Sequence, residues 1–299
     1  MKSLASFVLR GPIQAILITV VTGVLAMIMP PLSILSGAAV ALTTLRVGIR
    51  SGAMVVLGSI GLVAVLAGLT PGNMSPNTFY LSILWLVLLA TSWLLRETRS
   101  LAIITVTTGL MGMMGIAVTY LILGDVAGWW GGILPPLLEP AMQPGGPLAD
   151  PELARQIMEG LPKVLTGYIA AGLVLNTVIC LYLARSWQAR LFNPGGFRNE
   201  FYEMRFGLKP ALLSMTVLAL VLVPMGGLSS AAAEILIVVL SLYVIQGLAI
   251  IHAVVAKKKM HVAWLIVTYI VALFIMPQVV ALLGLVDTWT DFRKRINAV

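Results

Sequence analysis

Charged residues are scarce in this sequence. Only 10% of its 299 residues are Asp, Glu, Lys or Arg, 60% are hydrophobic, and the mean hydropathy is +1.03. Soluble domains carry about 25% charged residues, so an ordinary soluble domain is excluded. The apolar runs repeatedly reach the roughly 17–25 residues that cross a bilayer. Backbone groups in lipid must be hydrogen-bonded within the segment. We therefore predict an all-α fold, a polytopic transmembrane helix bundle with eight or nine membrane segments.

Cysteine and histidine are also nearly missing. The single cysteine, Cys180, lies inside an apolar segment, which excludes an intramolecular disulfide and a cysteine-based metal motif. The two histidines, His252 near the end of the segment at residues 231–256 and His261 after it, lie close to Lys257–Lys259, where we expect a loop role rather than metal ligation. The sequence contains no Walker loop, no metal-ligating pair at helical spacing and no Gly-x-Ser-x-Gly elbow. We therefore predict no metal, no cofactor and no catalytic residue, and we expect the protein not to be an enzyme.

Basic residues outnumber acidic ones, which gives a formal net charge of +8. They collect in short stretches between apolar segments, where they set the orientation in the membrane, rather than in a surface for nucleic acid. The predicted cytoplasmic determinants are Arg46, Arg50, Arg96, Arg99, Lys257, Lys258 and Lys259, joined by Lys2, Arg10 and the Arg185–Lys209 stretch. We therefore expect a multi-pass membrane protein with a cytoplasmic N-terminus, the lipid bilayer as its partner and no nucleic acid.

Hydropathy divides the chain into three parts. Residues 1–124 form an N-terminal membrane half with five segments, residues 125–163 an external or interfacial connector, and residues 164–299 a C-terminal membrane half with three or four segments. The predicted segments are 13–29, 32–45, 52–69, 79–95, 101–123, 164–184, 211–225, 231–256 and 262–286. The uncharged turn at residues 70–77 is expected outside. Because Pro277 breaks the last segment, nine full crossings and eight crossings plus a re-entrant element are both open, as is the side of the C-terminus.

The connector reads DVAGWWGGILPPLLEPAMQPGGPLADPELARQIMEGLPK. Its prolines predict no continuous helix before about Asp150. From there an Asp at the N-cap, Pro151 at the first helical position and Glu152 in the first turn predict a short amphipathic helix. Trp129 and Trp130 are typical of the headgroup layer. A lid over an outward-facing cavity and a simple surface connector both fit this pattern.

Few polar side chains fall inside the apolar segments. Glu234 is the only carboxylate close to one. It would either stabilise the first turn of its helix through the helix dipole or bind a ligand or proton. Asn176 and Gln246 lie at membrane depth, where such groups often bridge helices. We name Asn176, Glu234 and Gln246 as candidate ligand-binding residues, lining one cavity near the bilayer midplane.

Small residues recur at every fourth position in the first two segments. Such faces let helices approach closely, within one chain or between two subunits. Both alternatives are open for these positions, which are also the candidate partner-docking residues for another membrane protein: Ala15, Thr19, Gly23, Ser33, Gly37 and Ala41.

Three stretches resemble the YybS-like family of multi-pass bacterial membrane proteins. They are PPLSILSGAAVALTTLRVGIRSG (residues 30–52), NPGGFRNEFYEMRFGLKP (193–210) and GLVDTWTDFRKR (284–295). The first six segments are also distantly similar to the substrate-binding (S) components of energy-coupling-factor importers, where a small-residue face of the first helix docks onto a coupling subunit. Ala15, Thr19 and Gly23 hold the comparable place.

The second resemblance implies a non-catalytic component that binds or helps to translocate a small solute, which is our leading hypothesis. The alternative is a membrane assembly or scaffold protein that contacts another membrane complex, and a membrane-embedded lipid enzyme is the third hypothesis. Neither the composition nor the motifs identify the solute.

Overall fold

The computed structural model describes residues 2–69, 76–270 and 276–295, which contain helices and no strand. The elements are α1 (Lys2–Val8), α2 (Pro12–Leu25), α3 (Leu32–Arg46), α4 (Ile49–Leu69), α5 (Pro76–Thr98), α6 (Leu101–Leu123), α7 (Val126–Met142), α8 (Pro151–Gly160), the 3-10 turn η1 (Leu161–Lys163), α9 (Leu165–Phe192), α10 (Gly196–Glu203), α11 (Leu208–Leu222), α12 (Gly227–Lys257), α13 (Ala263–Ile270), α14 (Pro277–Thr290) and α15 (Phe292–Arg295). The all-helical class predicted from the sequence is confirmed.

Within the residues that the structure describes, five helices are long and apolar enough to cross a membrane, namely α4, α5, α6, α9 and α12. The helices α10 and α11 meet at a bend of 50° and add a sixth span if they act as one. The apolar helices α2 and α3 have only 14 and 15 residues, or about 21 to 23 Å, against a hydrocarbon core of about 30 Å. The chain is thus a multi-pass membrane protein whose helix lengths support five or six crossings, fewer than the eight or nine predicted.

Contacts group the chain into two compact units. Unit 1 comprises residues 1–108, 175–205 and 252–256, and unit 2 comprises residues 109–174, 206–251 and 257–299. The long helices α6, α9 and α12 contribute residues to both units. The division at residues 125 and 163 rests on hydropathy, and it stays a prediction.

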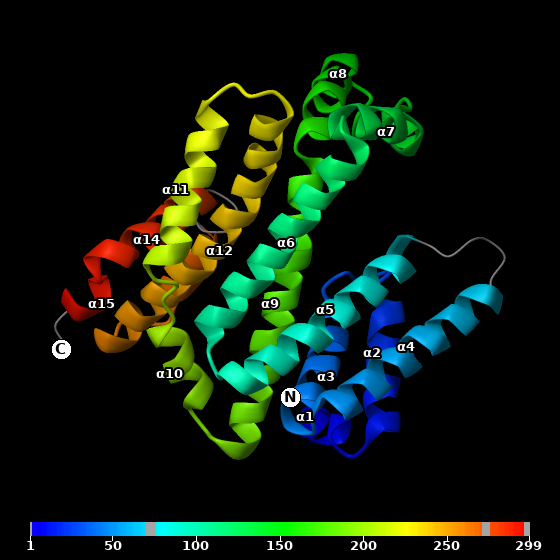
Figure 1. Ribbon diagram of the computed structural model, residues 1–299. Helices are drawn as coiled ribbons and strands as arrows, with labels where there is room; N and C mark the ends of the chain where they lie inside the picture. The colour runs from blue at the N-terminus through cyan, green and yellow to red at the C-terminus, as the bar shows by residue number, and fades with distance from the viewer. Residues whose placement is uncertain (1, 70–75, 271–275, 296–299) are drawn as a thin grey trace. The chain divides into compact units, whose positions relative to one another are not determined.

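The central helix of unit 1 is α3. It is surrounded by α2, α4 and α5 (Figure 1), and every residue from Ser36 to Leu45 is buried. The guanidinium of Arg96 donates to the last carbonyls of α3, those of Thr44 at 3.4 Å and Leu45 at 3.1 Å, as basic side chains do at helix C-termini. A helix too short to span a bilayer can lie at membrane depth here, because protein rather than lipid surrounds it.

The core of unit 2 forms where α6, α9 and α12 meet. Its buried side chains are Ile116, Ala171, Val174, Val238 and Leu242. A Cβ on Gly112 would meet the side chain of Val174 at 2.5 Å, and one on Gly109 would meet that of Leu242. The glycines of α6 therefore let α9 and α12 approach closely.

The proline-rich half of the connector is a helix, which corrects our prediction of no continuous helix before Asp150. Helix α7 contains Pro135, Pro136 and Pro140. A proline cannot bond the carbonyl four residues earlier and crowds it. For Pro135 and Pro136 those positions are Gly131 and Gly132, which are exposed and have no neighbour at the Cβ site. Solvent or headgroups can therefore satisfy the freed carbonyls, so the helix persists.

The short amphipathic helix predicted after Asp150 is confirmed as α8. The Asp150 side chain accepts hydrogen bonds from the backbone N–H groups of Glu152 and Leu153, at 2.9 and 3.4 Å. Pro151 occupies the first helical position, where its missing N–H costs nothing. These local signals are sufficient to predict where α8 begins, because an N-cap side chain accepts from N–H groups of residues adjacent in the sequence.

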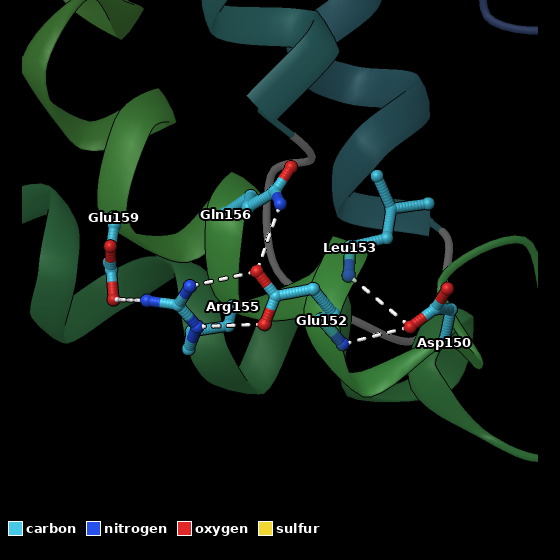
Figure 2. A network of polar contacts seen from close by, with 6 residues as sticks. All are labelled: Asp150, Glu152, Leu153, Arg155, Gln156 and Glu159. Carbon is cyan, nitrogen blue, oxygen red and sulfur yellow. Dashed lines mark hydrogen bonds and ion pairs between the residues drawn. The ribbon is translucent and has the colours of Figure 1, made fainter.

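A network of polar contacts covers the exposed face of α8 (Figure 2). Arg155 lies between two carboxylates and donates to Glu152 at 2.8 Å and to Glu159 at 2.7 Å. Gln156 also donates to Glu152, at 2.9 Å. These side chains are spaced three or four residues apart, so they share one helix face. Because the ion pairs are more than half exposed, solvent screens them and each contributes little.

Acid is expected to loosen α8 by a small amount. The hydrogen bonds from Arg155, and then from Gln156, hold the pKa of Glu152 below its ordinary value. The stabilisation is therefore present above the ordinary glutamate pKa and is lost as the pH falls through the lower pKa of the folded helix. Hydrogen exchange of the α8 amides in the full-length protein, corrected for intrinsic rates, should rise across that window. Arg155→Gln should weaken this pH dependence, because only the hydrogen bond from Gln156 to Glu152 then remains. Equal protection of the wild type and the variant at neutral pH would contradict a stabilising role of Arg155.

The Arg185–Pro210 stretch, which lies between two predicted membrane segments, is largely helical. Helix α9 continues to Phe192, and α10 follows from Gly196. The guanidinium of Arg185 binds both carboxylate oxygens of Glu200, at 2.9 and 2.6 Å. The rings of Phe197 and Phe201 pack edge-on against Tyr182. This bidentate ion pair and the aromatic contacts pack α10 against the end of α9.

The last predicted segment is divided at its proline. Pro277 is the first residue of α14, and α13 ends before it at Ile270. Residues 271–275, and most of the turn predicted at residues 70–77, lie outside the described ranges.

Candidate functional site

Glu234 begins the third turn of α12, because this helix begins at Gly227 rather than Ala231. Its first turn contains no acidic residue, so the helix-dipole role that we considered for Glu234 is wrong. The residues before Ala231 belong to this first turn. The hydroxyls of Ser229 and Ser230 donate to the carbonyl of Gly226, at 2.8 and 3.3 Å, and Gly226 itself adopts a φ of 59°, which glycine allows without strain.

The carboxylate of Glu234 is completely buried between three helices of unit 2. The Tyr120 hydroxyl of α6 donates to its Oε1 at 2.9 Å. The backbone N–H of Gly167 donates to its Oε2, and the Thr166 hydroxyl forms a third hydrogen bond. The first four N–H groups of a helix have no partner within it, and Gly167 is the third residue of α9. Glu234 therefore caps α9 from a neighbouring helix, where the dipole of α9 favours negative charge.

Glycine at position 167 makes this contact possible. A Cβ there would lie 2.9 Å from the carbonyl oxygen of Glu234 and 3.0 Å from its Cα. These are backbone atoms, which cannot rotate away as a side chain can. Only glycine lets the beginning of α9 approach α12 closely enough for the Gly167 N–H to reach the carboxylate.

The connector is attached to this cluster. The indole Nε1–H of Trp130, on α7, donates to the hydroxyl of Thr166 at 2.9 Å. A continuous chain of hydrogen bonds thus runs from Trp130 through Thr166 to Glu234. Because such networks couple the positions of their members, a shift of α7 would change the hydrogen bonding of the buried carboxylate.

Gln246 joins two other parts of unit 2. Its side chain is completely buried; the Oε1 accepts from the N–H of Phe206 at 2.9 Å, and the Nε2 donates to the carbonyl of Gly284 at 2.6 Å. Gly247 and Gly284 lie at the same crossing of α12 and α14. Every polar atom of the Gln246 amide therefore has a structural partner, as in a helix-bridging role.

Asn176 lies in unit 1, where it joins α9 to α3 and α5. Its Nδ2 donates to the hydroxyls of Ser33 and Tyr80, at 3.0 and 2.8 Å. The thiol of Cys180, one turn later in α9, donates to its Oδ1 at 3.5 Å. This is again the pattern of a polar side chain that holds helices together.

The three candidate ligand-binding residues thus have separate sets of partners. Glu234 and Gln246 both belong to unit 2 but share no partner, and Asn176 belongs to unit 1. A single cavity lined by all three stays a prediction. The residues that actually surround Glu234, namely Tyr120, Thr166 and Gly167, carry no sequence signal that pairs them with it, because they lie 67 to 114 residues away.

All six small-residue positions of the first two segments are buried within the chain: Ala15, Thr19, Gly23, Ser33, Gly37 and Ala41. The hydroxyl of Ser36 donates to the carbonyl of Thr19 at 2.7 Å, and the indole of Trp85 donates to Ser36 at 3.0 Å. The structure therefore uses these faces for internal packing, one of the two alternatives, and leaves them no exposed surface for a partner.

The histidines differ from each other. His261 lies between α12 and α13 and accepts from the N–H of Ala263 at 3.1 Å, as expected of a loop residue. His252 lies inside α12, with its ring 5.5 Å from that of Phe201, so a loop position is wrong for it, because the helix continues to Lys257. Within the described ranges, no group of three His, Cys, Asp or Glu side chains could hold a metal ion.

Comparison with protein families identifies a class. Residues 149–288 match a family described as predicted membrane protein (DUF2232). The matched stretch begins just before α8 and ends within α14, so it contains Asn176, Glu234 and Gln246 but none of the six small-residue positions. Comparison with curated proteins and with solved structures gives no match. The match supports a multi-pass membrane protein, in agreement with the helices described above.

Proposed function

We propose that this protein is a non-catalytic component of the bacterial inner membrane that binds, or helps to move, a small solute, with its N-terminus in the cytoplasm. The binding group is Glu234. The resemblance to S components supports the solute-binding role, and the basic clusters between the segments support the cytoplasmic N-terminus. The main observation behind the proposal is the buried carboxylate of Glu234.

The charge of Glu234 is not neutralised by a basic side chain in the described part of the chain. Its hydrogen-bond partners in the described part of the chain are a phenol, a hydroxyl and a backbone N–H, none of which is basic. A buried carboxylate is costly at membrane depth unless it is paired or protonated, and such residues mark ion and substrate pathways. A proton or the cationic group of a solute would supply the missing positive charge.

The hydrogen-bond chain to the connector suits a gated site. Trp130 lies on α7, outside the long apolar helices, and reaches Glu234 through Thr166. A solute that displaced Tyr120 or Thr166 from the carboxylate would change the position of α7. This supports the lid hypothesis for the connector over a simple surface connection.

The test compares the wild type with Glu234→Gln, a nearly isosteric change that removes the charge. Both are purified in mild detergent, and the co-purifying small molecules and proteins are identified by mass spectrometry. We expect a stoichiometric cationic solute with the wild type and a tenfold to hundredfold loss with the variant, about the value of a charged hydrogen bond. Glu139→Gln, at an exposed glutamate of α7, is the matched control and should retain the solute.

Proton binding gives a different result in the same comparison. A carboxyl band that titrates with pH in the infrared difference spectrum of the wild type, and is absent from Glu234→Gln, would identify the proton as the bound species. Recovery of another membrane complex without solute, and without a titrating band, would reject the proposal in favour of the scaffold alternative.

A further inference from the structure

The chain turns sharply after α14 and is held there by a buried carboxylate. Asp291 adopts a left-handed conformation with a φ of 49°. The completely buried Asp287 accepts from the N–H of Phe292 at 2.9 Å and from Arg293 Nη2 at 3.2 Å. Because a buried charge requires such partners, this ion pair fixes the direction in which α15 leaves.

The turn brings two basic runs together. The ammonium group of Lys257, the last residue of α12, donates to the carbonyl of Arg293 at 3.2 Å. Residues 257–259 and 293–295 are therefore neighbours in unit 2, although they are separated by α13 and α14 in the sequence. The exposed members, which we call the basic cluster, are Lys257, Lys258, Lys259, Lys294 and Arg295.

The segment between the two runs bears the marks of lipid contact. Helix α13 has no buried residue, and Ile266 and Val267 are 60% and 51% exposed, as expected of side chains that face lipid. In the sequence, Trp264 follows the first basic run by five residues and Trp289 precedes the second by four, and they are 56% and 52% exposed. Tryptophan is enriched at the membrane interface, so both ends of the segment carry the residues of one interfacial layer.

We propose that the basic cluster binds the phosphate groups of anionic phospholipids, at a membrane interface that the segment between Lys259 and Arg293 both enters and leaves. The segment is then re-entrant, and the C-terminus lies on the side of Lys257–Lys259. Within the cluster and its turn, the five exposed cations have one acidic neighbour that is not fully buried, the half-buried Asp291, which pairs with Lys294 at 3.1 Å. Clusters of four to eight basic residues beside a transmembrane helix attract anionic headgroups. This inference is independent of the role of Glu234.

The first experiment measures lipid preference. The full-length protein is placed in phosphatidylcholine vesicles containing either brominated phosphatidylglycerol or brominated phosphatidylcholine, and tryptophan quenching is recorded. We expect stronger quenching by the anionic lipid. In the triple variant Lys257→Gln, Lys258→Gln, Lys259→Gln the preference should fall about a hundredfold, since each basic residue contributes roughly fivefold.

Two controls make the outcome decisive. The variant Lys2→Gln, Arg50→Gln, Arg99→Gln removes three exposed basic residues of unit 1 and should keep the preference. A preference that survives in the lysine variant would overturn the proposal. Inorganic phosphate at constant ionic strength should not abolish the preference, and abolition would assign the cluster to free phosphate instead of lipid.

The second experiment tests the path of the chain. Single cysteines at Lys258→Cys and Arg295→Cys are treated with a membrane-impermeant maleimide applied to one side of sealed vesicles. Cys180 is buried and should give little background. Labelling of both positions from the same side supports the re-entrant segment, whereas labelling from opposite sides rejects it.

Discussion

Gly284→Ala is expected to separate α14 from α12 and to destabilise unit 2 by about 3 kcal/mol or more. The added Cβ would overlap the carbonyl oxygen of Tyr243 and lie 2.9 Å from the backbone nitrogen of Gly247. Both are main-chain atoms of α12, so relief requires the helices to move apart. The bond from Gln246 to the carbonyl of Gly284 would be lost in the same movement, leaving a buried amide without one of its partners.

Thermal unfolding of the purified protein in mild detergent measures this effect. Gly172→Ala is the matched control, because Gly172 lies within α9 with no atom near its Cβ site. Alanine there should be neutral or should stabilise the helix by up to about 1 kcal/mol. If Gly284→Ala and Gly172→Ala unfold at the same temperature, the close crossing of α12 and α14 does not exist in the membrane protein.

The sequence predicts those features that depend on neighbouring residues. The segment at residues 101–123 coincides with α6, since hydropathy and helix length need only the local composition. The N-cap at Asp150 is equally local, with its acceptor and donors within three residues. The class of the protein and the amphipathic helix therefore follow from the amino-acid sequence alone.

The two incorrect predictions, for α7 and for the dipole role of Glu234, have a different cause. Prolines are expected to break a helix because they leave a carbonyl without its hydrogen bond. In α7 the carbonyls concerned belong to Gly131 and Gly132, which are exposed and can bond to solvent. The dipole role of Glu234 depended on a helix start at Ala231, whereas α12 begins four residues earlier, at Gly227. For α7, the rule fails because solvent can satisfy the carbonyls that the prolines leave free. For Glu234, an error of about one turn in the predicted helix start changes the role assigned to the side chain.

The site itself could not be derived from spacing. Glu234 is identified by its charge in an apolar segment, but Tyr120 and Gly167 become its partners only through the packing of α6 and α9 against α12. Isolated glycines such as Gly167 and Gly284 lack the four-residue repeat that revealed the small-residue faces of α2 and α3. The repeat correctly indicates close approach, but it does not indicate which helix approaches.

Gly37→Leu is expected to disrupt unit 1 within the single chain, by about 3 kcal/mol or more. Gly37 lies on the central helix α3, where even a Cβ would come within 2.6 Å of the Leu88 Cδ1 and 3.1 Å of the Cys180 Cβ. Leucine adds three further carbon atoms to a site that is already filled by α5 and α9. Neighbouring side chains can rotate to relieve one methyl group, but not a whole isobutyl group, because protein interiors are close-packed.

The expected result also decides how the small-residue face is used. If Gly37 packs internally, Gly37→Leu lowers the unfolding temperature of the monomer and its yield as a monodisperse peak in size-exclusion chromatography. Gly61→Leu, on an exposed position of α4 with no neighbour at the Cβ site, should leave both unchanged. The Gly37→Leu monomer could instead be as stable as the wild type but fail to retain a co-purifying membrane protein. That result would support a partner-docking role for this face. Burial of the whole Ser36–Leu45 stretch favours the first outcome, since a helix covered on every side has no surface left for a second subunit.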